Sequence, residues 1–102
     1  MHLKHVATLL TCTAACMTAH AQYPAKPIKI IPNSAAATGP DVIARLFASK
    51  AQENLRQAVV VENRPGSNGN IAGDLVAKAA PDGYTLFLGT DAQIAINPHV
   101  YS

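Results

Sequence analysis

The chain has 102 residues, with 8 lysines and arginines against 6 aspartates and glutamates, and aromatic residues make up 5% of it. This near balance of charge and the low aromatic content exclude the basic surface that nucleic acids require, so we expect no nucleic-acid partner. Both cysteines and three of the four histidines fall within the first 21 residues, so His99 is the one histidine in the remainder. We therefore expect neither a disulfide framework nor a metal site in the remainder, and no cofactor.

The first 21 residues have the pattern of a secretory signal peptide. Lys4 supplies the positive start, Val6–Thr18 is apolar or small, and Ala19-His20-Ala21 fits a small-x-small cleavage site. The apolar stretch is too short to span a bilayer. We predict cleavage after Ala21; the alternative is a short buried helix.

Beyond residue 21, short apolar runs alternate with helical patterns. Strands are predicted at Ile28–Ile31, Val59–Val61 and Tyr84–Leu88. Helices are predicted over Asp41–Asn54 and Ile71–Ala80, the second ended by a Pro-Asp-Gly turn. The order strand, helix, strand, helix, strand indicates an α/β fold class, a parallel sheet with flanking helices and right-handed crossovers.

The helical segments also predict which side chains face the core. In the first helix the apolar stripe comprises Val42, Ile43, Leu46, Phe47, Ala51 and Leu55, and in the second the inward residues are Ile71, Leu75, Val76 and Ala79. Thr38 and Asp41 have the spacing of a capping box. Gln93–Ile96 is predicted to begin a short helix that Pro98 ends, and residues 97–102 to contain no regular element.

A polar loop follows each predicted strand: Pro32–Pro40, Glu62–Asn70 and Gly89–Ala92. Because parallel strands bring their carboxyl ends to one edge of a sheet, where ligands bind, we expect these loops to lie together. Their side chains are almost all small neutral hydrogen-bonding groups. Two of the loops run into helix N-termini, whose free N–H groups favour an anion such as a carboxylate.

Structural roles compete with these binding roles. Asn, Ser and Thr before helices are common caps, and Asp41 alone is best explained as a cap. Glu62 and Arg64 are expected to form a solvated pair that anchors the second loop. The alternative is that Arg64 pairs with an anionic ligand, although the adjacent Pro65 favours the structural role. The chain lacks a dinucleotide or phosphate-loop motif and a nucleophile elbow. A lone His99 has no evident partner for acid–base catalysis.

Several motifs resemble one family closely. Three motifs are similar to the Bug family, the periplasmic solute receptors of tripartite tricarboxylate transporters. They are Glu62-Asn63-Arg64-Pro65-Gly66, Ala80-Pro81-Asp82-Gly83-Tyr84-Thr85-Leu86 and Ile96-Asn97-Pro98. The resemblance implies a type II-like periplasmic-binding-protein fold of two α/β lobes. It divides the chain into a signal peptide, 1–21, and a partial N-terminal lobe, 22–102.

The resemblance also implies a function. A family member is a periplasmic receptor, not an enzyme, that captures small carboxylates, delivers them to membrane transporter subunits and is a monomer at full length. Carried over by position, ligand contacts are expected from Asn33, Ser34, Thr38, Asp41, Ser67, Asn68, Gly69, Asn70, Thr90 and Asp91. One departure is the first loop, which has Ala35-Ala36-Ala37 where the family is usually rich in glycine.

We expect the chain to be the front segment of a longer receptor, since family members are longer than one such lobe. Two alternatives stay open at this point. The chain is a truncated product of a shortened receptor gene with no binding activity, which predicts that residues 22–102 do not melt cooperatively. Or it is a small secreted enzyme that uses Asp91 or His99, which predicts loss of activity on His99→Ala.

Overall fold

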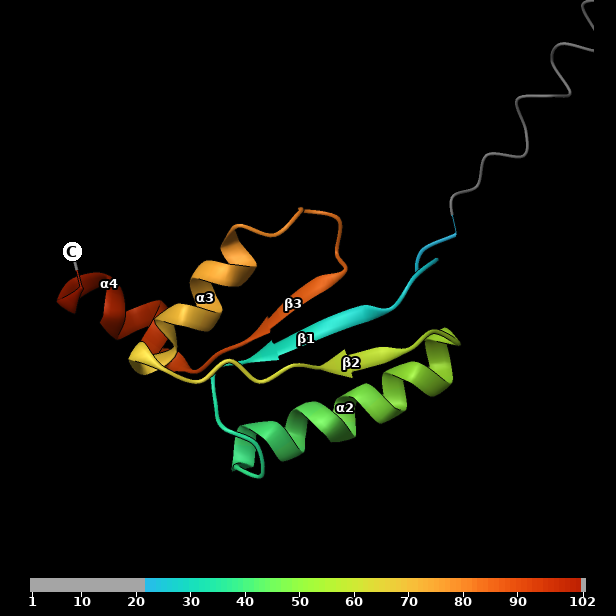
Figure 1. Ribbon diagram of the computed structural model, residues 1–102, viewed down its shortest axis with the longest axis horizontal. Helices are drawn as coiled ribbons and strands as arrows, with labels where there is room; N and C mark the ends of the chain where they lie inside the picture. Colours follow the sequence, from blue (N-terminus) through green and yellow to red (C-terminus); the bar gives the residue numbers. More distant parts are fainter. Residues whose placement is uncertain (1–21, 102) are drawn as a thin grey trace, which may run out of the picture.

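A parallel sheet of three strands forms the centre of the fold. The computed structural model describes residues 22–101 (Figure 1). The strands are β1 (Ile28–Pro32), β2 (Val59–Val61) and β3 (Thr85–Leu88), in the order β2-β1-β3. Both pairings of β1 are parallel, which confirms the predicted fold class. The predicted signal peptide lies outside the described residues.

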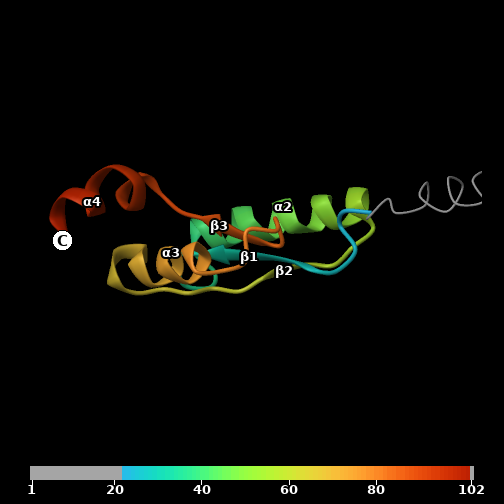
Figure 2. The same cartoon turned by 90° about the horizontal axis from the view of Figure 1, so that it is seen from above.

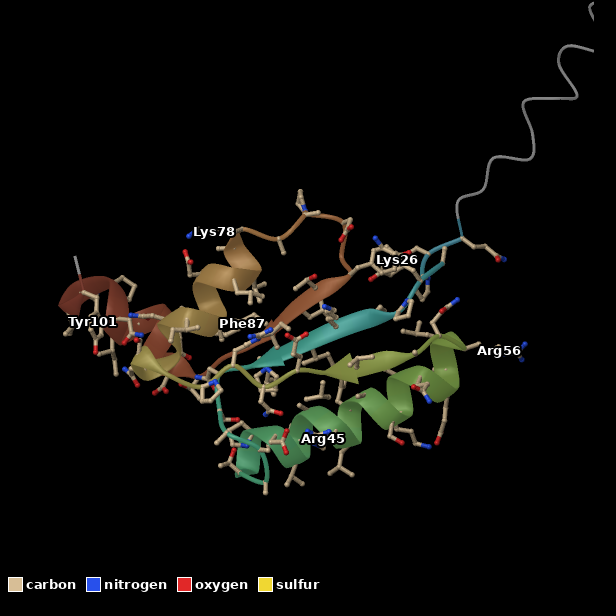
Figure 3. All side chains as sticks on the ribbon, in the orientation of Figure 1. Lys26, Arg45, Arg56, Lys78, Phe87 and Tyr101 are labelled. Atoms are coloured by element: carbon tan, nitrogen blue, oxygen red, sulfur yellow. The ribbon has the colours of Figure 1, made fainter. Side chains whose placement is uncertain are left out.

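Helices cover both faces of this sheet. α2 (Gly39–Leu55) packs on β2 and β1, and α3 (Asn70–Ala77) packs on β3 and β1. Figure 2 shows the two helices on opposite sides of the strands. Because β1 lies between the strands that follow the two helices, each crossover covers a different face. Phe87 extends from β3 toward α3 (Figure 3).

The described chain ends in two short helical segments. A π-helical segment, η3, spans Ala92–Ile96, and α4 spans Asn97–Val100. The prediction that Pro98 ends a helix and that the last residues lack regular structure was wrong. Pro98 lies in the first turn of α4, where a helix has no use for the N–H that proline lacks.

The remaining elements differ from the prediction mainly at their ends. β1 extends to Pro32, α2 begins at Gly39, and β3 begins at Thr85 instead of Tyr84. α3 stops at Ala77, three residues before the predicted end. Within the predicted second loop, Ser67–Gly69 forms a 3₁₀ turn, η2, that leads directly into α3.

Alanines, not the larger apolar residues, hold α2 against the sheet. The core cluster is formed by Ile28, Ile30, Ala44, Ala48 and Val59. The predicted apolar stripe of α2 was therefore wrong as an account of its buried face. Its large members Val42, Ile43, Leu46 and Phe47 are 50–67% exposed. The small Ala44 and Ala48 side chains let the helix backbone approach the strands closely.

In α3, too, a small side chain is buried where a large one was predicted to point inward. Ala72 is fully buried, whereas Ile71, which was predicted to point inward, is 49% exposed. Leu75, Val76 and Ala79 are half-buried. The helix therefore lies close to the sheet along its alanine, and its larger apolar side chains lie at the edges of the contact.

An apolar groove runs between α2 and β3. It is lined by Ile30, Ile43, Ala44, Phe47, Leu86, Phe87 and Leu88. Ile43, Phe47 and Leu86 are between 40% and 61% exposed here. Within residues 22–101, α2 packs mainly on β1 and β2, so this face of β3 is only partly covered. Such an exposed apolar face favours association of the isolated segment.

The tight contact of α3 predicts that Ala72 does not accept a larger side chain. We expect Ala72→Leu to lower the free energy of unfolding by about 1–3 kcal/mol, because added methylenes must displace closely packed neighbours. The matched control is Ala77→Leu at the exposed end of the same helix, where we expect a change within about 0.5 kcal/mol. Urea unfolding of both variants measures this, and equal effects would contradict close packing at Ala72.

Candidate functional site

Three loops meet at the carboxyl end of the sheet. They follow β1, β2 and β3, whose arrowheads all point toward α4 in Figure 1. The prediction that the three loops share one edge is confirmed by the parallel pairing. Helices α2 and α3 both begin at this same edge. We refer to the three loops as loop 1 (33–38), loop 2 (62–69) and loop 3 (89–91).

The side chain of Gln93 lies at the centre of this edge. Its Oε1 accepts a hydrogen bond from Asn33 Nδ2 of loop 1 at 2.8 Å. The same oxygen accepts from the Thr90 backbone N–H at 2.7 Å and from Thr90 Oγ1 at 3.1 Å. Gln93 Nε2 donates to the Asn68 carbonyl of loop 2 at 2.5 Å. One carboxamide therefore bonds to all three loops.

Asn97 provides a second connection, within loop 2 and the start of α3. Its Nδ2 donates to the Asn68 carbonyl at 3.1 Å and to Asn70 Oδ1 at 2.5 Å. Asn68 Nδ2 in return donates to Asn97 Oδ1 at 2.8 Å. Asn97 is only 4% exposed, so its amide is committed to these contacts and fixes loop 2 independently of Gln93.

Sequence reasoning missed both Gln93 and Asn97. The signal that could have found them is their spacing of four residues, which places two amides on one face of a helical segment. That face points back to the loops because η3 begins immediately after loop 3. In the sequence, Asn97 stands out only as part of the family motif Ile96-Asn97-Pro98.

The absence of a side chain at Gly69 leaves room for the Gln93 carboxamide. The φ of Gly69 is +86°, which L side chains rarely adopt, and the residue is buried. A Cβ at this position would lie 2.2 Å from Gln93 Nε2 and 2.9 Å from Asn33 Nδ2. The glycine predicted as a ligand contact therefore makes room for the carboxamide that joins the loops.

Asp41 joins loop 1 to loop 2. Its carboxylate, 3% exposed, accepts from Ala37 N–H at 2.9 Å, Arg45 Nε at 3.0 Å and Asn63 Nδ2 at 2.9 Å. Asn63 Nδ2 also donates to the Ser34 carbonyl at 3.1 Å. The bond from Arg45, then those from Ala37 and Asn63, lower the pKa of Asp41 from 3.8 to about 2. The carboxylate is thus charged across the neutral range.

The predicted capping box was wrong. Thr38 precedes α2 but makes no side-chain cap bond; its hydroxyl donates to the Ala35 carbonyl at 2.7 Å. Asp41 bonds to the N–H of Ala37, one residue before Thr38. The reason is the turn at Ala37, whose φ of +64° directs its N–H at the carboxylate.

Except for Ser34, the other predicted site residues divide into two groups. Asn33, Asn68, Asn70 and Thr90 belong to the amide network described above. Thr38, Ser67 and Asp91 are exposed at the rim. Ser34 is half-buried, and its hydroxyl oxygen is the buried side-chain atom without a hydrogen-bond partner within residues 22–101. Such a buried hydroxyl without a partner needs an explanation, and a role at the site is one candidate.

The predicted pair of Glu62 and Arg64 is present. Arg64 Nη2 donates to Glu62 Oε1, and Lys29 Nζ lies 3.4 Å from Glu62 Oε2. Arg64 and then Lys29 lower the pKa of Glu62. Arg64 is therefore engaged with its neighbour at the base of loop 2, as the anchoring interpretation requires.

The edge is thus lined by neutral donors and acceptors. Across residues 22–101, no three His, Cys, Asp or Glu side chains are grouped as metal ligands would be. No helix of that segment is both long enough and apolar enough to cross a membrane. His99 is exposed on α4 and Asp91 is exposed in loop 3.

Comparison with known families gives a match. Residues 43–102 match the sequence profile of the family described as "Tripartite tricarboxylate transporter family receptor". A UPF0065 protein of Bordetella pertussis is 38% identical over 100 residues, which cover 97% of this chain. The chain spans 31% of that relative's length. Protein BugT of the same organism is 46% identical over 70 residues, covering 69% of this chain and 22% of BugT.

Solved structures agree with this match. A structure described as a periplasmic transporter superposes with a TM-score of 0.72 at 42% identity, covering 76% of this chain and 26% of that chain. The R. palustris protein Rpa4515, solved with adipate, superposes with a TM-score of 0.68 at 35% identity, covering 70% of this chain and 24% of that chain. Both likenesses include sequence as well as fold.

The low pKa of Asp41 predicts acid sensitivity. Because the folded pKa lies below the unfolded one, the carboxylate stabilises the fold fully above about pH 5, and this contribution is lost as the pH falls toward 2. We expect Asp41→Asn to be less stable at pH 7 and to lose less stability between pH 5 and 2. Urea unfolding across this range measures both curves, and parallel curves would assign the acid sensitivity elsewhere.

Gly69 predicts a second effect. We expect Gly69→Ala to lower the free energy of unfolding by about 1 kcal/mol or more, because the residue must keep a positive φ and the Gln93 amide must move. Gly39→Ala is the matched control, since no heavy atom lies within 4 Å of a Cβ placed there. We expect that control to be neutral or slightly stabilising in thermal unfolding. A neutral Gly69→Ala would show that the turn is not constrained.

Proposed function

The chain belongs to the tripartite tricarboxylate transporter receptor family, a family of solute receptors rather than enzymes, and we propose that it forms part of the N-terminal lobe of such a receptor. The resemblance to the Bug family is therefore confirmed. We further propose that residues 1–21 are its signal peptide, cleaved after Ala21, and that residues 22–102 belong to a lobe completed by further chain, as in the longer relatives.

The convergence of three loops on one carboxamide carries the functional proposal. Gln93 shows that groups from loops 1, 2 and 3 lie within hydrogen-bonding distance of a single polar group. A small ligand at this edge can therefore contact all three loops at once. Several neutral donors acting together suit a carboxylate, since each hydrogen bond to a charged acceptor is stronger than a neutral one.

We propose a small dicarboxylate as the ligand. Adipate is bound in one of the similar structures, and the site offers hydroxyls and amides in place of a lysine or arginine at its centre. Direct contacts are proposed from Asn33, Ser34, Asn70 and Thr90. Thr38, Ser67, Asn68, Gly69 and Asp91 complete the proposed site at its rim and in its backbone.

Asp41 has a different proposed role. A buried carboxylate would repel an anionic ligand, and both of its oxygens already accept hydrogen bonds from the protein. We propose that Asp41 shapes loop 1 and holds it against loop 2 while Arg45 balances its charge. It thus belongs to the site as a residue that positions the loops.

The place of action follows from the family. We propose that the protein works in the periplasm as a monomer and delivers its ligand to the membrane subunits of a tripartite transporter. The second proposed lobe would close over loops 1–3, since they lie at the exposed carboxyl end of the sheet (Figure 1).

This function is tested by measuring ligand binding calorimetrically, with the receptor in the form that its source organism secretes. We expect binding of adipate or a related dicarboxylate, and an affinity about tenfold lower for Thr90→Val, which removes one hydroxyl hydrogen bond to a charged group. Thr85→Val is the matched control, because Thr85 begins β3 at the end opposite to loop 3, in which Thr90 lies. We expect it to bind as the parent does.

Two results would contradict the proposal. If no dicarboxylate binds the parent receptor, the ligand class is wrong. If Thr90→Val and Thr85→Val bind equally well, the ligand lies away from loop 3. An intact mass equal to that of residues 22–102 in a periplasmic extract would instead favour the truncated, non-binding product.

A further inference from the structure

We propose that Asn33 Nδ2, Thr90 N–H and Thr90 Oγ1 form the subsite for one carboxylate oxygen of the ligand, and that Gln93 Oε1 occupies this subsite until the ligand displaces it. This inference rests on the proposed function and adds to it a competitor from within the chain. The ligand carboxylate and the Gln93 carboxamide would exchange for the same three donors.

The number of donors is the first observation. Three donors, at 2.7, 2.8 and 3.1 Å, point at the single Oε1 atom of Gln93. A neutral amide oxygen has two lone pairs, so it is a poor match for three donors. A carboxylate is charged, has more acceptor sites and forms hydrogen bonds about twice as strong. The donor set therefore fits an anion better than the group now bound to it.

The shape of the occupant is the second observation. A carboxamide is planar and has nearly the same size as a carboxylate. The space around it is set by two glycines: a Cβ on Gly69 would lie 2.2 Å from Gln93 Nε2, and one on Gly89 would lie 3.1 Å from Gln93 Oε1. The absence of a side chain at these two positions thus leaves room between loops 2 and 3 for one planar group of three heavy atoms.

The third observation is that other bonds hold loops 1 and 2 when Gln93 moves. Asn97 holds Asn68 and Asn70 by its own hydrogen bonds, and the Asn33 N–H donates to the Leu88 carbonyl at 3.3 Å. An open pocket of about 240 Å³, lined by Asn70, Gln93, Asn97, Pro98 and Tyr101, adjoins the Gln93 side chain. Rotation about the side-chain bonds of Gln93 would therefore move its amide into solvent-accessible space, and the proposal requires that the donors keep their positions.

The need to displace the Gln93 carboxamide reduces the apparent affinity for the ligand. When only a fraction of the molecules has the subsite free, the observed dissociation constant rises by the inverse of that fraction. Removing the occupant should then tighten binding. A strut that merely holds the loops together predicts the opposite sign, because its removal would loosen the site.

The first test is adipate binding by the receptor with Gln93→Ala. We expect about tenfold tighter binding than the parent. Gln57→Ala, just before β2 at the opposite edge of the sheet, is the matched control and should bind as the parent does. Weaker or unchanged binding by Gln93→Ala would overturn the proposal in favour of a strut. Absence of adipate binding by the parent would contradict the proposed function instead.

The second test does not depend on the identity of the natural ligand. Acetate, which carries a single carboxylate, is titrated into the ¹⁵N-labelled parent and the Gln93→Ala variant while the Thr90 amide signal is followed. We expect the Thr90 N–H to shift downfield at an acetate concentration about tenfold lower in the variant. Equal titration curves, or a Thr90 signal that acetate never moves in the variant, would overturn the proposal.

Discussion

The pairing of β1 with both of its neighbours is the constraint on which the remaining structure depends. Parallel registers on each side, Ile30 with Val61 and Ile30 with Leu86, make all three strands end at one edge. The loops that follow have no regular partners of their own, so their polar side chains bond to one another across this edge. The candidate site is thus a consequence of strand direction before it is a consequence of any single side chain.

The same constraint explains why part of the fold was predictable. Short β-branched runs and polar loops identify parallel strands locally, and the ends of β2 were predicted correctly. Burial on the helices was not, because it depends on how closely two elements approach. Ala44 and Ala72 are buried since small side chains permit a short helix–sheet distance, and Phe47 then lies at the side of that contact. Hydrophobic periodicity indicates which face of a helix points toward the sheet, but it carries no information about the distance between the helix and the sheet.

The site shows a similar limit. Thr90 and Asn70 were predicted from their positions after strands or before helices, which the chain order reveals. Gln93 was not, because its role depends on contacts with residues 25 and 60 positions away. A glutamine in a short helical segment has no local signature. The apolar groove beside β3 was missed for the same reason. Its side chains are hydrophobic in any sequence scan, and only the three-dimensional arrangement shows that α2 leaves the face of β3 partly uncovered.

Charge decides what the edge can hold. Asp41 is the buried acid next to loop 1, and without compensation its field would oppose an anionic ligand. Arg45 and the donors from Ala37 and Asn63 absorb this charge, which is why the pKa of Asp41 falls to about 2. The remaining donors at the centre are neutral and are already directed at one oxygen atom. If the proposed site is correct, such a receptor attracts an anionic ligand weakly at long range and recognises it by the geometry of the donors. Because the Gln93 carboxamide accepts from all three of those donors, they are paired in the absence of a ligand.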